Sequence, residues 1–359
     1  MPPLLASTLT KSTQRLLLLQ SSTAQSCLPI IRRLVTETRS NLSHPGSTLL
    51  FCLLYPPSAF AGAAQLGSEC LRTFDWTGNV PGYTLGCTIT PPDIREEIRA
   101  AVRSAPPGPV VVIVDSVDTL FSDLGSLAKT EQFLSEIFGL VCSRSGSRLV
   151  LHVLAPSPLI PILTQTRFSP ALTHIIAHPP ALLSHLATAY LTPPPPLSTP
   201  EKFWRVFLPI ADRHYESEKL VFTSDGEGPG SAEFAVELLV RGADGSARRK
   251  GVEHVLEGWI DSHNSSGGCP CDLQDLDDLK GLWKRNTIEE IVPDPTQNLP
   301  FNLNLTAQQQ LSRAQVPLPY EHNGTSKDKG VDVTPAAILY DPDSADDIDD
   351  DDPDEDLDI

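Results

Sequence analysis

The 359-residue chain has no apolar run that approaches the ~18–20 residues a helix needs to cross a lipid bilayer. Its first residues also lack the uninterrupted apolar stretch and small-residue cleavage site of a secretory signal. The seven cysteines are an odd number, and several sit among apolar residues, where a reduced thiol behaves as a small hydrophobic side chain. We therefore expect a protein of a reducing compartment that neither spans a membrane nor is secreted.

Familiar catalytic motifs are missing as well. The chain contains neither the His-Glu-x-x-His pattern of metalloproteases nor the Gly-x-Ser-x-Gly elbow that exposes a nucleophilic serine. Nucleotide hydrolysis needs a cradle of backbone N–H groups and a lysine on the phosphates, yet no Gly-Lys-Ser or Gly-Lys-Thr triplet occurs. The sequence therefore predicts no hydrolase site of these kinds.

Basic residues are absent from the C-terminal end, where residues 341–359 hold 12 acidic side chains. Residues 1–340 carry 33 acidic and 27 basic side chains, a net charge of −6 out of the total of −18. The end of the chain repels itself and has too little apolar area to offset the entropy of ordering. We expect a disordered acidic tail that can compete with RNA or bind a basic partner.

What the chain does contain is a series of short apolar runs bounded by turn formers, the pattern of buried parallel strands. Between these runs, segments 92–103 and 129–141 carry apolar residues at helical spacing. The alternation predicts an α/β fold, a largely parallel sheet flanked by helices. The expected strands are residues 16–19, 49–55, 110–114, 149–154 and 174–177.

After four prolines at 193–196, residues 204–208 and 219–222 are predicted as further strands. Residues 234–241 and 251–260 are predicted to form a hairpin. This hairpin would extend the sheet in antiparallel fashion.

Periodicity fades at the end of this region, which predicts a folded domain over residues 1–262 and a linker over 263–300. A short ordered motif is expected at 301–320, because a capping box at its centre favours a helix over 307–313. The disordered acidic tail is assigned to residues 321–359.

The loop after the first expected strand, residues 21–27, stands where a phosphate loop would stand. It has no glycine for a tight wrap and no lysine for the phosphates, so independent ATP hydrolysis is not expected. The strand 110–114 ends at Asp115, as magnesium-positioning strands do in nucleotide hydrolases. Asp115 is either a strand-end carboxylate that caps the next turn or a vestige of a nucleotide site completed across an interface.

Possible metal ligands are poorly spaced. Cys269 and Cys271, with His263 before them, lack the two-residue spacer and the second ligand pair of a structural zinc site. His174 and His178 fall on an expected strand, where four residues span roughly 13 Å. No metal and no cofactor is predicted.

Three consecutive cations, Arg248, Arg249 and Lys250, stand beside the turn of the expected hairpin. A projecting turn is a position from which they could meet RNA phosphates. The alternative is an ordinary solvated turn.

Two C-terminal stretches resemble those of the fifth subunit of the Elongator complex. Residues 301–306 read Phe-Asn-Leu-Asn-Leu-Thr and continue to Val-Pro-Leu-Pro-Tyr at 316–320. The second stretch begins at 338–343 and ends in the acidic residues 351–359. At the level of motifs the match covers about the last sixth of the chain. Residues 13–262 are similar to that family in architecture, a RecA-like core that lacks the usual phosphate loop.

The resemblance implies a non-catalytic structural subunit of a RecA-like heterohexamer, with two copies each of the fourth, fifth and sixth Elongator subunits. It further implies contacts with the remaining subunits, tRNA binding and support of wobble-uridine modification by another subunit, in the cytoplasm, with the nucleus as a second location. One alternative is a divergent NTPase that combines Asp115 with a partner's lysine or arginine. Another is a mitochondrial matrix protein directed by the basic residues within 1–40.

Overall fold

The computed structural model forms a compact unit over Met1–Val292. Every helix of the described residues is too short or too polar to cross a membrane. The predicted tail and the triplet at 248–250 lie outside the described residues. The structure describes residues 3–10, 14–37, 46–62, 66, 68, 70–79, 93–222, 233–242, 252–261, 268–289, 308, 311 and 312.

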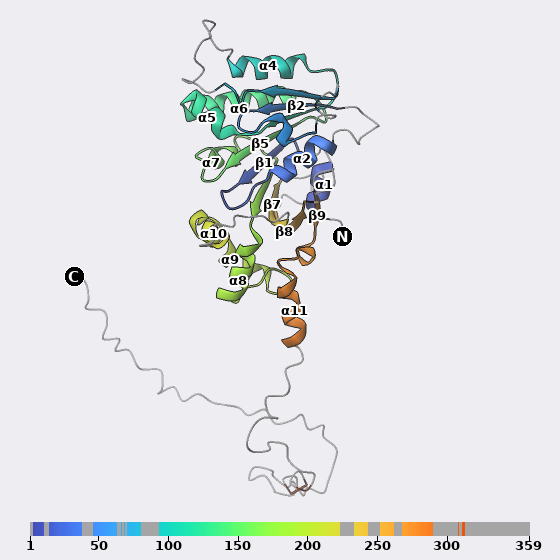
Figure 1. Cartoon of the computed structure of the whole chain (residues 1–359), viewed down its shortest axis with the longest axis vertical. Helices are drawn as coiled ribbons and strands as arrows, with labels where there is room; N and C mark the ends of the chain where they lie inside the picture. The colour runs from blue at the N-terminus through green and yellow to red at the C-terminus, as the bar shows by residue number, and fades with distance from the viewer. Residues whose placement is uncertain are drawn as a thin grey trace, which may run out of the picture. The chain divides into compact units, whose positions relative to one another are not determined.

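A nine-stranded sheet crosses the compact unit in the order β3-β2-β4-β5-β1-β6-β7-β8-β9 (Figure 1). The six strands from β3 to β6 in this order are parallel to their neighbours. The five predicted core strands are confirmed as β1, β2, β4, β5 and β6. The parallel strands are β1 (Leu16–Ser21), β2 (Ser47–Cys52), β3 (Leu71–Asp75), β4 (Val110–Val114), β5 (Arg148–Leu154) and β6 (Leu172–His178).

An antiparallel extension continues the sheet beyond β6. It consists of β7 (Glu233–Arg241), β8 (Val252–Ile260) and the short edge strand β9 (Cys269–Cys271). The predicted hairpin is confirmed as β7 and β8, whose residues pair along their full length. An α/β fold with a largely parallel sheet, flanking helices and an antiparallel extension is therefore the fold of this chain.

Helices cover both faces of the parallel strands. On one face, α4, α5, α6 and α7 pack on alternate strand residues such as Leu18 and Phe51. On the other face, α1 and α2 pack on the intervening residues, such as Leu17 and Leu50. Successive strand side chains point to opposite faces, so a continuous apolar run fills both cores. The helices are α1 (Leu4–Thr10), α2 (Leu28–Glu37), α4 (Ile94–Ser104), α5 (Val117–Leu124), α6 (Leu127–Cys142) and α7 (Ile160–Leu163), with the 3₁₀ turn η1 at Pro57–Ala59.

Two segments that the sequence predicted as strands are helices instead. Residues 204–208 lie within α9 (Pro200–Ala211), and residues 219–221 lie within α10 (His214–Val221). The prediction was wrong because a short apolar run, taken alone, does not distinguish a strand from one face of a helix.

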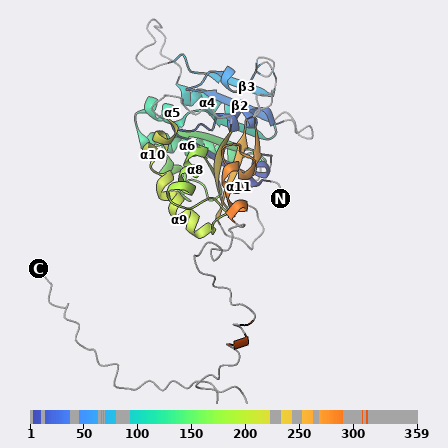
Figure 2. The same ribbon diagram turned by 60° about the horizontal axis from the view of Figure 1, so that its bottom comes forward.

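These helices build a third hydrophobic core beside the antiparallel strands. In α9, Phe203, Phe207 and Ile210 are buried at helical spacing, and the rings of Phe203 and Phe207 stack with centroids 5.1 Å apart. They pack with Leu273 and Leu276, which follow β9. In Figures 1 and 2, α8 and α9 lie close together, and Figure 2 shows them at the end of the molecule away from β3. The remaining elements of this region are α8 (Pro180–Ala189), η2 (Leu273–Asp275) and α11 (Lys280–Glu289).

The folded part extends beyond the boundary that the sequence predicted at residue 262. Within the predicted linker 263–300, β9 pairs with β8, and three buried leucines, Leu273, Leu276 and Leu279, join the third core. The sequence reasoning missed this because three-residue strands and 3₁₀ turns carry almost no periodicity. Of the predicted helix 307–313, the described residues Gln308, Leu311 and Ser312 are helical.

Candidate functional site

The loop that follows β1 lies at the carboxyl edge of the parallel sheet, between the ends of β5 and β6. It leads directly into α2, so residues 21–27 form the strand-to-helix turn at which a phosphate loop would lie. Ala24 and Cys27 are fully buried in this turn, and Gln25 is buried as well. Side chains of the chain itself therefore occupy the turn.

Hydrogen bonds within the loop use several of its backbone N–H groups. The N–H of Ser22 donates to the carbonyl of Gln25 (2.9 Å), and the N–H of Gln25 donates to the hydroxyl of Ser22 (3.1 Å). The N–H of Cys27 donates to Oγ of Ser21 (2.8 Å). A phosphate loop directs such groups at a bound anion, whereas here they close the loop on itself.

Ser21 also connects this loop to β5. Its Oγ lies 2.6 Å from Nε2 of His152, and Nδ1 of His152 lies 2.5 Å from the carbonyl oxygen of Asp115. Because a carbonyl oxygen only accepts, Nδ1 carries the proton and Nε2 accepts the hydroxyl hydrogen of Ser21. Burial lowers the pKa of His152, which favours the neutral ring that this arrangement needs. The chain of hydrogen bonds joins the ends of β1, β4 and β5.

The carboxylate of Asp115 is fully buried and binds backbone. It accepts the N–H groups of Leu53 (2.6 Å), Leu54 (3.0 Å) and Tyr55 (2.8 Å), the three residues that follow β2. Burial raises the pKa of Asp115, and these three hydrogen bonds offset part of that effect. Asp115 thus fastens the chain at the end of β2, the strand beside its own.

A cavity of about 60 Å³ lies next to this loop. Its lining includes Gln20 and Ser21 from β1, His178 from β6, His214 from α10 and Glu237 from β7. The cavity is therefore bounded by the carboxyl ends of β1 and β6, by β7 and by the helices α9 and α10.

Glu237 is a buried carboxylate held between two imidazoles. Its two oxygens lie 2.7 Å from Nε2 of His178 and 2.7 Å from Nε2 of His254. Burial alone would raise the pKa of Glu237, but the bonds and charges of the two histidines outweigh it and lower the pKa to about 2. The ring of Trp204 stacks on His254 with centroids 3.7 Å apart, so α9 is fastened to this cluster.

The possible metal ligands named from the sequence are dispersed. His174 contacts Gln20, with 3.0 Å between Nε2 and Oε1, whereas His178 faces Glu237. Cys269 and Cys271 are free thiols on the edge strand β9. Within the described ranges, no three His, Cys, Asp or Glu side chains are placed so that they could hold a metal ion together. His263 lies outside these ranges.

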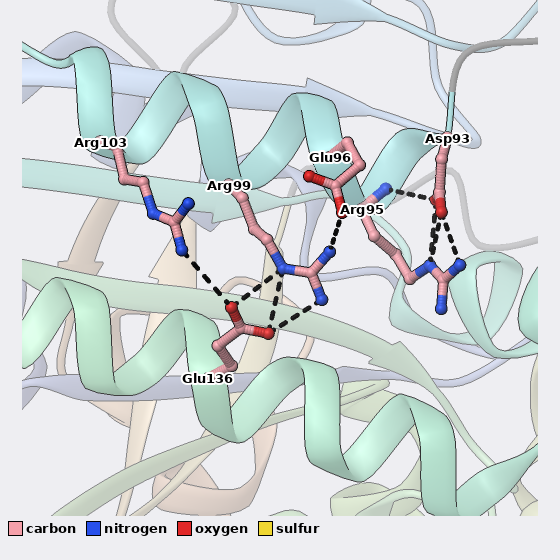
Figure 3. A network of polar contacts seen from close by, with 6 residues as sticks. All are labelled: Asp93, Arg95, Glu96, Arg99, Arg103 and Glu136. Carbon is pink, nitrogen blue, oxygen red and sulfur yellow. Dashed lines mark hydrogen bonds and ion pairs between the residues drawn. The ribbon is translucent and has the colours of Figure 1, made fainter.

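The candidate RNA-contacting residues Arg248, Arg249 and Lys250 lie outside the described residues. A different row of cations, on α4, is engaged in contacts within the chain (Figure 3). Arg99 binds Glu136 of α6 through two nitrogens at 2.9–3.0 Å, and Arg95 pairs with Asp93 at 2.5 Å. This network joins α4 to α6.

Comparison with known proteins relates part of the chain to one protein, although no family model matches it. Elongator complex protein 5 of Danio rerio is 40% identical over 68 residues, and that of Mus musculus is 37% identical over 70 residues. Each match covers 18% of this chain and 23% of the relative, so the chain spans about a quarter of the relatives' length. The chain therefore has distant, partial homology to Elongator complex protein 5.

Among solved structures, a KaiC-like protein of Pyrococcus horikoshii OT3 aligns over 71% of this chain and 88% of its own. The TM-score is 0.39 and the sequence identity 10%.

Proposed function

We propose that the chain is a non-catalytic structural subunit of the Elongator complex, equivalent to its fifth subunit. In this role it forms part of a RecA-like heterohexamer with the fourth and sixth subunits, binds tRNA and supports wobble-uridine modification. The observation that carries the proposal is the local homology to Elongator complex protein 5 in two vertebrates. The motifs at 301–306, 316–320 and 351–359 support it.

The closed loop at 21–27 supports the non-catalytic part of the proposal. Its N–H groups bind within the loop, and the lysine that would meet phosphate charge is absent. The competing idea, a composite NTPase site at Asp115, needs a carboxylate that is free to position a magnesium ion. The three backbone N–H groups bound to Asp115 weigh against that idea.

A cytoplasmic location, with the nucleus as a second one, goes with this proposal. The mitochondrial alternative requires cleavage within residues 1–40. That stretch contains β1, which lies at the centre of the sheet, and α1, whose Leu5 and Leu9 are buried in the core. Cleavage after β1 would take the central strand out of the fold, and cleavage between α1 and β1 would take the buried leucines of α1 out of the core.

Affinity purification of the full chain from its own cells, followed by mass spectrometry, tests the proposal. We expect the fourth and sixth Elongator subunits to co-purify in equal amounts with this chain, and light scattering to give the mass of a hexamer. Added tRNA should bind to that assembly. Recovery of the intact chain without either subunit would contradict the proposal.

A further inference from the structure

We propose that Ser21 and His152 form a latch that holds the first strand-to-helix loop shut. The carboxyl end of β1 is then kept filled by the protein's own side chains, whether or not a nucleotide is present. This inference rests on the geometry of the loop and not on membership of the Elongator complex. Its failure and that of the proposed function are therefore separate results.

The hydroxyl of Ser21 is the common point of the latch. It accepts the N–H of Cys27, at the far end of the loop, and donates to Nε2 of His152 in β5. Ser21 and His152 are 3% and 2% exposed, so water does not readily replace either bond. One hydroxyl therefore sets both the closure of the loop and its attachment to the sheet.

The loop in turn positions two helices. The carbonyl of Cys27 accepts the N–H groups of Ile30 and Ile31 at the start of α2. On the other side of the loop, the hydroxyl of Thr23 donates to the carboxylate of Glu218 in α10. Opening the latch should therefore loosen the start of α2 and the attachment of α10 together.

The orientation of His152 makes the latch specific to its neutral ring. The carbonyl of Asp115 fixes the proton on Nδ1, which leaves Nε2 free to accept from Ser21. A side chain at position 152 that still donates to the carbonyl of Asp115 but cannot reach Ser21 would test the bond to Ser21 alone. Asparagine meets this requirement, because its amide reaches the position of Nδ1 but not that of Nε2.

Hydrogen exchange measured by mass spectrometry on the full-length chain tests the latch. In Ser21→Ala, amides 22–28 should exchange about tenfold faster than in the wild type, because the N–H of Cys27 loses its acceptor. His152→Asn should accelerate the same amides to a similar extent. In the double variant these amides should exchange no faster than in the faster single variant, since both substitutions remove the same Ser21–His152 hydrogen bond.

Ser116→Ala is the matched control. It removes a hydroxyl that is 4% exposed and caps α5 at the same edge of the sheet, so it costs comparable stability without touching the loop. Amides 22–28 should exchange at the wild-type rate in this variant. The latch is refuted if Ser21→Ala leaves that rate unchanged, if Ser116→Ala raises it equally, or if the effects of Ser21→Ala and His152→Asn add.

A second readout tests whether the loop is filled by the chain alone. A non-hydrolysable ATP analogue with magnesium, at millimolar concentration, should leave the exchange of amides 22–28 unchanged in the wild type. Slower exchange in its presence would mean that the loop opens to hold phosphate, which would overturn the inference.

Discussion

Asp115 holds three backbone N–H groups at the end of the neighbouring strand, and this accounts for an acidic residue in a fully buried position. A buried carboxylate is tolerated where hydrogen bonds replace its hydration. Glu237 follows the same rule with two histidines as partners. In both cases the charge is tied to the fold, which is a structural use of residue types that often serve catalysis.

Asp115→Ala should lower the free energy of unfolding by about 2–4 kcal/mol, since three N–H groups lose a common acceptor. Urea unfolding followed by circular dichroism measures the change. Asp123→Ala, an exposed substitution on α5, is the control and should stay within about 0.5 kcal/mol of the wild type. Equal stability of the two variants would contradict the role given to Asp115.

His174 should make stability depend on mildly acidic pH. Burial is the main reason that its pKa is lowered from 6.5 to about 4. In the unfolded chain His174 binds a proton below about pH 6.5, whereas in the folded chain it does so only below about pH 4. The contribution of His174 to the free energy of unfolding is therefore complete above pH 6.5. It decreases by roughly 3 kcal/mol as the pH falls toward 4.

Urea unfolding at several pH values between 7 and 4, on the wild type and on His174→Gln, isolates this contribution. Glutamine does not titrate, so the variant should show a flatter dependence over that range. The lowered pKa of Glu237 acts at lower pH, between about 4.5 and 2, and does not obscure the result. An equally steep loss of stability in His174→Gln would exclude this explanation.

Among the secondary-structure elements, α9 shows where sequence reasoning failed and why. Phe207 and Ile210 lie three residues apart and are both buried, which is possible on a helix, whereas a strand would turn them to opposite faces. Phe207→Ala should cost about 3–5 kcal/mol and Ile210→Ala about 2–4 kcal/mol. Leu208→Ala, at a position that is 41% exposed, is the control and should cost much less.

Urea unfolding of the three variants measures these costs. If Ile210→Ala were as mild as Leu208→Ala, the segment would not be a helix that packs as described. A clear loss in both Phe207→Ala and Ile210→Ala, with little change in Leu208→Ala, is the expected pattern.

The parallel strands could be predicted because each is buried on both faces and therefore reads as a continuous apolar run. The edge strand β3, Leu-Arg-Thr-Phe-Asp, was missed because only its first residue is buried and the other four are half-buried or exposed, so it shows no continuous apolar run. The latch was missed because it joins residues 131 positions apart in the sequence. One signal was present: His152 interrupts an apolar strand, and a buried imidazole needs a partner.

Taken as a whole, the chain is a largely parallel α/β sheet whose first strand-to-helix loop is held closed by hydrogen bonds within the chain. The central strand β1 ends at a closed turn, and Asp115, at the end of β4, holds the chain that follows β2. Helices cover both faces of the parallel strands, an arrangement that suits the proposed role of a subunit that contributes surface to an assembly. The proposed place in the Elongator complex agrees with such a passive role.

The most direct test of this account is ATP binding and turnover by the purified full-length chain, free of partner proteins. Isothermal calorimetry with ATP and magnesium should give no saturable binding at millimolar nucleotide, and phosphate release should not exceed that of a buffer blank. Saturable binding with turnover that Asp115→Ala abolishes, while the variant remains folded, would contradict the account.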